Sequence, residues 1–186
     1  MNAVWLAAQV VVQVSVGARY SGTLVHDSIV TPVDVRPSIA PAFAVAVALP
    51  EHRGWSGQAM LDCSWSGLKR ENAGGTSEDL GGLGALSFSV SLRRSLPAGL
   101  GARATVGGLR YLPARESGVF RAGAGGLFPL LGVGIDYAPG LAGLTLELRA
   151  DAHRFLTQAL RDVGFNERRL VPRFTLAVRT SLSSLW

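Results

Sequence analysis

The chain has 186 residues, of which 48% are hydrophobic and 17% charged, and its formal net charge is +5. This length fits one domain better than two, and no run approaches the roughly 18 apolar residues of a membrane-spanning helix. The single cysteine, Cys63, excludes an intramolecular disulfide and the cysteine spacing of a zinc site.

The N-terminal segment resembles the end of a secretory signal. Leu6-Ala7-Ala8 has the small-residue character of a cleavage site, but the preceding residues include no basic side chain and are too few for a complete leader. We therefore interpret residues 1–8 as a signal-peptide remnant or an N-terminal tail. Residues 9–186 are interpreted as one domain.

Alternation of apolar and polar side chains is the strongest pattern that follows, because successive side chains of a strand point to opposite faces. In the last segment, for example, Phe174 and Leu176 flank Thr175. The pattern predicts strands, in chain order, at 9–17, 39–49, 58–65, 86–93, 101–111, 119–138, 144–153 and 173–186. The two Gly-rich strands should carry bulges or kinks at Gly107-Gly108, Gly125-Gly126 and Pro129.

The connections between these segments alternate between short and long. Tight Gly- and Pro-containing turns are predicted at 50–54, 97–101 and 139–143, and longer polar loops at 21–34, 69–82, 112–118 and 157–170. Short and long connections then lie at opposite ends of the molecule. This arrangement predicts an all-β fold with an even number of antiparallel strands in up-and-down order, about eight.

Alternation alone also fits a soluble, lipocalin-like ligand-binding barrel with its apolar face turned inward. In such a barrel the second face of 39–49 would meet water, yet it carries five alanines, and Lys69 is the only lysine of the chain. Soluble surfaces usually mix Lys and Glu. The composition therefore favours a barrel with its polar face inside and its apolar face toward lipid.

Aromatic residues favour the two membrane interfaces, so their positions give an independent indication. Trp55, Tyr137 and Trp186 fall at the short-turn ends of strands, and Tyr20, Trp65, Tyr111, Phe120 and Phe155 fall near the long-loop ends. We expect these residues to form two girdles.

The chain resembles the small bacterial outer-membrane barrel proteins of the OmpA, OmpX and OmpW kind. The resemblance extends over nearly the whole chain, and its specific part is the strand Phe174–Trp186, which alternates and ends on an aromatic residue. It implies that 9–186 form a closed transmembrane β-barrel in the outer membrane, with short turns on the periplasmic side. It also implies that Phe174 and Trp186 belong to a signal read by the barrel-assembly machinery.

The polar parity predicts an interior network in which arginines and carboxylates neutralise one another, because unpaired charges in such a space are costly. An eight-stranded barrel has room inside for side chains but not for a large pore. The expected network consists of Arg19, Asp62, Arg93, Arg103, Asp136, Glu147, Arg149, Asp151, Arg173 and Arg179.

Arginines near the long-loop end are candidates for binding anionic lipid headgroups, including lipopolysaccharide. The main candidates are Arg70, Arg110, Arg115, Arg121 and Arg154, and Lys69, Arg161, Arg168 and Arg169 lie at the same end. The alternative is a set of solvated loops in which these cations mix with acidic residues. Since the arginines are scattered without stacking aromatics, nucleic-acid binding is not expected.

Traces of enzyme chemistry are few. His26, Asp27 and Ser28 are adjacent, but neighbouring side chains of an extended loop diverge and do not form a catalytic triad. Lipid A-modifying acyltransferases or deacylases share this barrel size, yet no His-x-Ser arrangement begins at His153. We therefore expect a structural or surface-interaction role with no catalytic residue, cofactor or metal.

Overall fold

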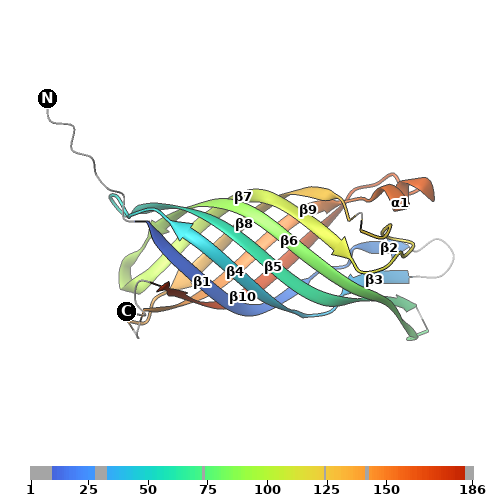
Figure 1. Ribbon diagram of the computed structural model, residues 1–186, viewed down its shortest axis with the longest axis horizontal. Helices are drawn as coiled ribbons and strands as arrows, with labels where there is room; N and C mark the ends of the chain where they lie inside the picture. The colour runs from blue at the N-terminus through green and yellow to red at the C-terminus, as the bar shows by residue number, and fades with distance from the viewer. Residues whose placement is uncertain (1–9, 28–32, 73, 124, 141–142, 183–186) are drawn as a thin grey trace, which may run out of the picture.

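The computed structural model describes residues 10–27, 33–72, 74–123, 125–140 and 143–182, and it consists almost entirely of strands (Figure 1). The strands are β1 (Val11–Ser21), β2 (Val25–Asp27), β3 (Val33–Pro37), β4 (Ala40–Ala48), β5 (Trp55–Asn72), β6 (Ser77–Ser95), β7 (Leu100–Pro113), β8 (Leu127–Tyr137), β9 (Leu144–Phe155) and β10 (Arg169–Ser181). Two short helical segments are η1 (Pro97–Gly99) and α1 (Gln158–Asp162). In the described ranges no helix has the length and apolar character needed to cross a membrane.

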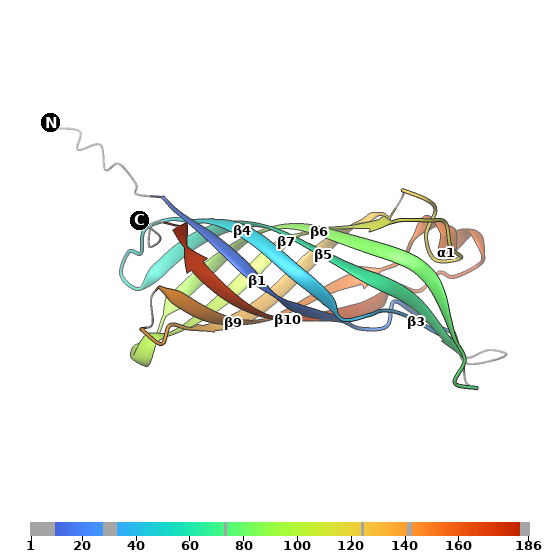
Figure 2. The same ribbon diagram turned by 60° about the horizontal axis from the view of Figure 1, so that its bottom comes forward.

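Eight of the ten strands close into a ring. Strand β1 pairs with β4 on one side and with β10 on the other, and the remaining neighbours pair antiparallel in the order β4, β5, β6, β7, β8, β9, β10. The β5–β6 pairing closes the ring, and the strands run obliquely around the long axis (Figures 1 and 2). The predicted closed up-and-down barrel is therefore confirmed.

The short connections lie at the end of the barrel where β1 begins and β10 ends, and β2, β3 and α1 lie at the opposite end (Figure 1). We call these the turn end and the mouth. At the mouth, β3 pairs with residues 68–72 of β5, beyond the point where β4 leaves β5. The sheet thus continues past the ring on one side of the barrel.

Three sequence-based boundaries at the mouth were wrong. The loop expected at 69–82 is the tip of the β5–β6 hairpin, where opposite charges face each other across the strands as Lys69↔Asp79 and Arg70↔Glu78. The loop expected at 21–34 contains β2 and the start of β3, and the sixth ring strand begins at Leu127 instead of Val119. The charged side chains at the hairpin tip interrupt the apolar–polar alternation, so the sequence pattern ends before the strands do.

Side-chain direction follows strict parity in the ring. In β4, Ala42, Ala44 and Ala46 are buried inside, and the intervening Phe43 and Val45 are exposed outside. Small residues on the inner face leave room for longer side chains from other strands. The outward face is mainly apolar in the ring strands, and its charged side chains lie near the strand ends.

Gly107 lies where the backbones of β6 and β7 approach closely, and it does not form the expected bulge. The β6–β7 and β7–β8 registers run through Gly107 and Gly108 without a shift, and in the described pairing of β5 with β6 the shift falls at Leu68/Lys69. A Cβ on Gly107 would lie 2.2 Å from the Phe88 carbonyl oxygen. Glycine is needed here for close backbone approach.

Gly107→Ala should therefore lower the free energy of unfolding by about 1 to 3 kcal/mol, because the added methyl overpacks the wall. The matched control is Gly108→Ala, whose Cβ would meet only Leu127 Cδ1 at 3.5 Å and should be near neutral. Urea unfolding of protein refolded into vesicles, followed by tryptophan fluorescence, measures both. Equal midpoints for the two variants would contradict this packing.

Candidate functional site

The turn-end half of the interior is organised around Asp136 of β8. Arg93 donates from Nη2 to Asp136 Oδ2 at 2.7 Å, and Arg103 donates from Nη2 to Asp136 Oδ1 at 3.1 Å. Glu147 lies beside this carboxylate in register on β9, 3.3 Å from Arg103 Nη1 and 3.2 Å from Arg179 Nη1. Side chains from β6 to β10 thereby meet in one cluster.

A second cluster, nearer the middle of the barrel, is organised around Asp62 of β5. Arg19 of β1 engages both carboxylate oxygens, with Nη1 to Oδ1 at 2.5 Å, and Arg149 Nη2 donates to Oδ2 at 2.7 Å. Ser87 adds a hydroxyl donor at 3.2 Å, and Arg19 Nε donates to Thr175 at 2.9 Å. The Asp62 carboxylate on β5 therefore connects β1, the neighbouring strand β6, and β9, which lies four strands away around the ring.

Arg149 joins the two clusters, since its Nη1 lies 3.8 Å from Glu147 Oε1 while its Nε lies 3.4 Å from Asp151 Oδ2. All ten residues expected in the network therefore point inward, nine of them buried and Arg93 half-buried. They comprise six arginines and four carboxylates, a formal excess of +2.

Arg173 differs from the other five arginines. It is buried on β10, opposite Asp151 in register, yet none of its three guanidinium nitrogens has a hydrogen-bond partner among the described residues. It marks the boundary between the ionic interior and an aromatic mouth.

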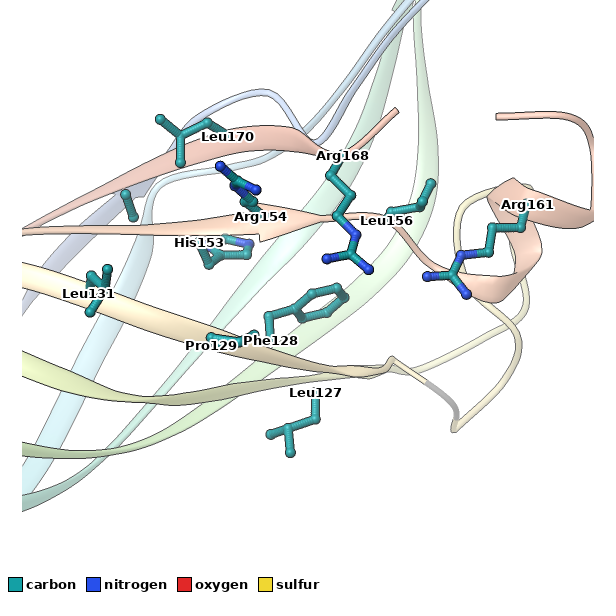
Figure 3. A pocket seen from close by; sticks show the side chains of 11 residues that line it. Leu127, Phe128, Pro129, Leu131, His153, Arg154, Leu156, Arg161, Arg168 and Leu170 are labelled. Carbon is teal, nitrogen blue, oxygen red and sulfur yellow. The ribbon is translucent and has the colours of Figure 1, made fainter. Parts of the chain in front are cut away.

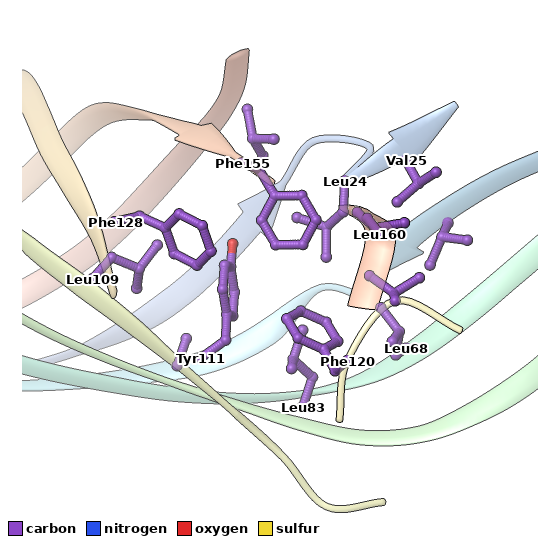
Figure 4. Packing of buried hydrophobic residues seen from close by; sticks show 14 of the residues in the cluster. Leu24, Val25, Leu68, Leu83, Leu109, Tyr111, Phe120, Phe128, Phe155 and Leu160 are labelled. Atoms are coloured by element: carbon purple, nitrogen blue, oxygen red, sulfur yellow. The ribbon is translucent and has the colours of Figure 1, made fainter. Parts of the chain in front are cut away.

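A cluster of packed rings that we call the aromatic cap lies in the mouth (Figure 4). Its members are Tyr111, Phe120, Phe128, His153 and Phe155. Ring centroids lie 5.3 to 6.3 Å apart, mostly tilted or edge-on, which aromatic quadrupoles favour. Tyr111 Oη lies 3.2 Å from His153 Nε2, while His153 Nδ1 is buried without a hydrogen-bond partner among the described residues.

The aromatic cap corrects the expected outer girdle. Tyr20 and Trp65 are exposed on the outside as expected, but Tyr111, Phe120 and Phe155 are buried inside. Strand parity predicts the inward position of two of these residues. Tyr111 shares a face of β7 with Arg103, and Phe155 shares a face of β9 with the inward Glu147. Phe128 was not singled out at all.

The five headgroup candidates are in different environments. Arg70 pairs with Glu78 at 3.4 Å, Arg115 Nε donates to the Leu80 carbonyl at 2.8 Å, and Arg121 pairs with Asp162. Arg110 and Arg154 are exposed on β7 and β9 and have no ion pair within the described residues. Of the five candidates, these two are exposed and have a guanidinium without a partner among the described residues.

The remaining candidate residues lie elsewhere. Phe174 is exposed on the outer face of β10, with its ring 6.4 Å from that of Tyr20, while Trp186 and the segment 1–8 fall outside the described residues. His26 Nδ1 lies 2.7 Å from Asp34 Oδ1 across the β2–β3 hairpin, and Ser28 also falls outside the described residues. Across the described ranges, no group of three or more potential ligands could hold a metal ion.

Asp62→Asn should destabilise the barrel by about 3 to 5 kcal/mol, because it leaves Arg19 buried without its counter-charge and removes the nearest of the carboxylates that face Arg149. Glu78→Gln is the matched control. It also removes a carboxylate paired with an arginine, but on the exposed hairpin, where such pairs contribute about 0 to 1 kcal/mol. Urea midpoints in vesicles compare them, and similar losses would show that Asp62 does not organise the interior.

Comparison with known proteins supports the fold. Neither the family models nor the curated proteins searched give a match. The crystal structure of Ail, the attachment invasion locus protein of Yersinia pestis, in complex with the heparin analogue sucrose octasulfate, is similar with a TM-score of 0.54 and 10% identity over 93% of this chain and 99% of that chain. The backbone structure of Ail in a phospholipid bilayer nanodisc gives 0.51 and 13% over 91% and 98%.

The outer membrane protein OprG from Pseudomonas aeruginosa superposes less well, with a TM-score of 0.47 and 8% identity over 94% of each chain, so the two Ail structures carry the comparison. Together with the closed ring and its antiparallel register, they establish the architecture. The chain has the fold of the small eight-stranded outer-membrane β-barrel proteins.

Proposed function

We propose that the protein is an outer-membrane β-barrel with a structural or surface-interaction role. The observation that carries this proposal is the continuous apolar outer face around a charged interior. Exposed members from seven ring strands are Val45, Leu61, Phe88, Val106, Val133, Leu148 and Leu176. Soluble monomers rarely expose apolar surface on this scale, whereas a bilayer stabilises it.

The turn end then faces the periplasm and the mouth faces outward, since barrels of this class have short periplasmic turns and longer outer segments. The β2–β3 and β5–β6 hairpins would extend beyond the membrane as a small sheet. Ail, which shares the fold, has been solved with a sulfated sugar. Exposed arginines at the mouth support an anionic partner here as well, with outer-membrane lipids as the first candidate.

We infer that the barrel has no large pore. Two ionic clusters occupy the interior, and the aromatic cap fills the mouth above them. A solute crossing the barrel would have to break buried ion pairs and separate packed rings. Such an interior would instead support the outer hairpins rigidly.

A non-enzymatic role agrees with the positions of the histidines. His153 is buried in the aromatic cap against Tyr111, and His26 pairs with Asp34 on an exposed hairpin. Neither arrangement provides the aligned nucleophile, base and orienting group that acyl transfer needs.

The outward position of Phe174 on β10 is compatible with recognition by the barrel-assembly machinery.

The membrane location is tested by two variants that each place an arginine on the outward face of β7, one in the middle of the strand and one at its mouth end. Val106→Arg in the middle of β7 should cost about 2 to 4 kcal/mol and reduce insertion, since a charge at the bilayer midplane is expensive. Leu112→Arg at the mouth end of β7 should cost at most about 1 kcal/mol. Both side chains face outward and are similarly exposed, at 53% and 41%.

Outer-membrane fractionation of cells and heat-modifiable gel migration provide the readouts. The wild type and Leu112→Arg should be recovered as folded outer-membrane protein, and Val106→Arg should be depleted. Recovery of the wild type as a soluble protein, or equal behaviour of the two variants, would contradict a membrane location.

A further inference from the structure

The β8–β9 seam opens at the mouth. Pairing between these strands ends at Leu130↔His153, but β8 stays paired with β7 as far as Leu127, and β9 stays paired with β10 as far as Phe155. Pro129 stands at the split and has no backbone N–H to continue the ladder. The strand ends thus diverge, and an open groove of about 490 Å³ lies over the gap (Figure 3).

The wall of this groove is apolar on the side that continues into the outer belt. Leu127 and Leu131 on β8 and Leu170 on β10 line it, and they are 75%, 64% and 65% exposed. Leu131 lies on the same face of β8 as Val133, farther down the barrel. An acyl chain lying along β8 would therefore pass from the groove into the bilayer without crossing a polar surface.

Three arginines border the same groove. Arg154 projects from β9, Arg161 lies in α1, and Arg168 immediately precedes β10. In Figure 3 Arg161 and Arg168 extend toward the space beside Phe128. None of the residues lining the groove is acidic, and none of the three arginines has an ion pair within the described ranges. This separates them from Arg70 and Arg121, whose charges are already matched.

We propose that this groove binds one phosphorylated, multiply acylated lipid of the outer leaflet. Its phosphates would contact Arg154, Arg161 and Arg168, and one acyl chain would lie against Leu127 and Leu131. Charge complementarity selects an anionic head, and guanidinium forks suit phosphate oxygens. The adjoining apolar wall selects a lipid over a free anion. This inference rests on the proposed membrane location of the barrel.

The test uses the full chain folded in phosphatidylcholine nanodiscs and titrated with lipid A, with bound lipid counted by native mass spectrometry. The wild type should retain one lipid A. Each arginine near an anionic surface contributes roughly fivefold in affinity, so Arg154→Gln, Arg161→Gln and Arg168→Gln together should weaken binding on the order of 100-fold.

The charge-matched control combines Arg36→Gln, Arg70→Gln and Arg121→Gln, which remove the same charge at the mouth from arginines already paired with carboxylates. It should bind lipid A within about threefold of the wild type, since surface pairs contribute little. Leu127→Asn with Leu131→Asn should weaken binding roughly tenfold with all three arginines present.

Equal binding by the groove variant and the control variant would overturn the proposal. Complete displacement of lipid A by millimolar inorganic phosphate would also overturn it, because the site would then hold only an anion. Heat-modifiable migration of the same samples separates the two levels of inference. A wild type that is folded and inserted but retains no lipid A refutes the groove alone, and one that fails to insert refutes the membrane role itself.

Discussion

In the hydrocarbon core of a bilayer every backbone N–H and C=O must be satisfied within the protein, and a closed ring of strands achieves this without edges. The other features of this molecule follow from that closure. A closed ring has only two faces, so strand parity alone decides whether a side chain lies on the outer face, which meets lipid in the proposed location, or in the interior. Charges that parity sends inside cannot reach bulk water easily, and so they must neutralise each other. Asp62 and Asp136 form ion pairs with arginines on five different strands.

The interior changes character along the barrel axis. Ion pairs between neighbouring and facing strands occupy the turn end and the middle, Arg173 lies at the boundary, and the aromatic cap lies in the mouth. Beyond the cap, Leu24, Leu83 and Leu160 pack as they would in a small soluble domain (Figure 4). The mouth therefore combines buried apolar packing with exposed hairpins.

Sequence periodicity predicted most of the ring and the inward placement of the charged residues, because both depend on parity within single strands. The three inward aromatics of the mouth were assigned to the girdle, although Tyr111 and Phe155 share parity with interior charges. For these two residues the preference of rings for interfaces and the strand pattern predict opposite positions, and the structure agrees with the strand pattern. Periodicity wrongly placed Phe120 in a strand, since it lies in the connection between β7 and β8 and packs against the rings of Tyr111 and Phe155. The groove was out of reach, because it depends on where two strands stop pairing.

The most direct measurement concerns which parity faces lipid. Nitroxide labels at Val133 and Leu176, introduced after Cys63→Ser, report contact with oxygen dissolved in the bilayer and with a water-soluble nickel chelate. Both positions are exposed on the outer face near the middle of their strands. In folded protein in vesicles, both labels should be relaxed by oxygen and shielded from the chelate. Relaxation by the chelate with little effect of oxygen would show that the apolar face meets water, and the barrel would not be embedded in the membrane.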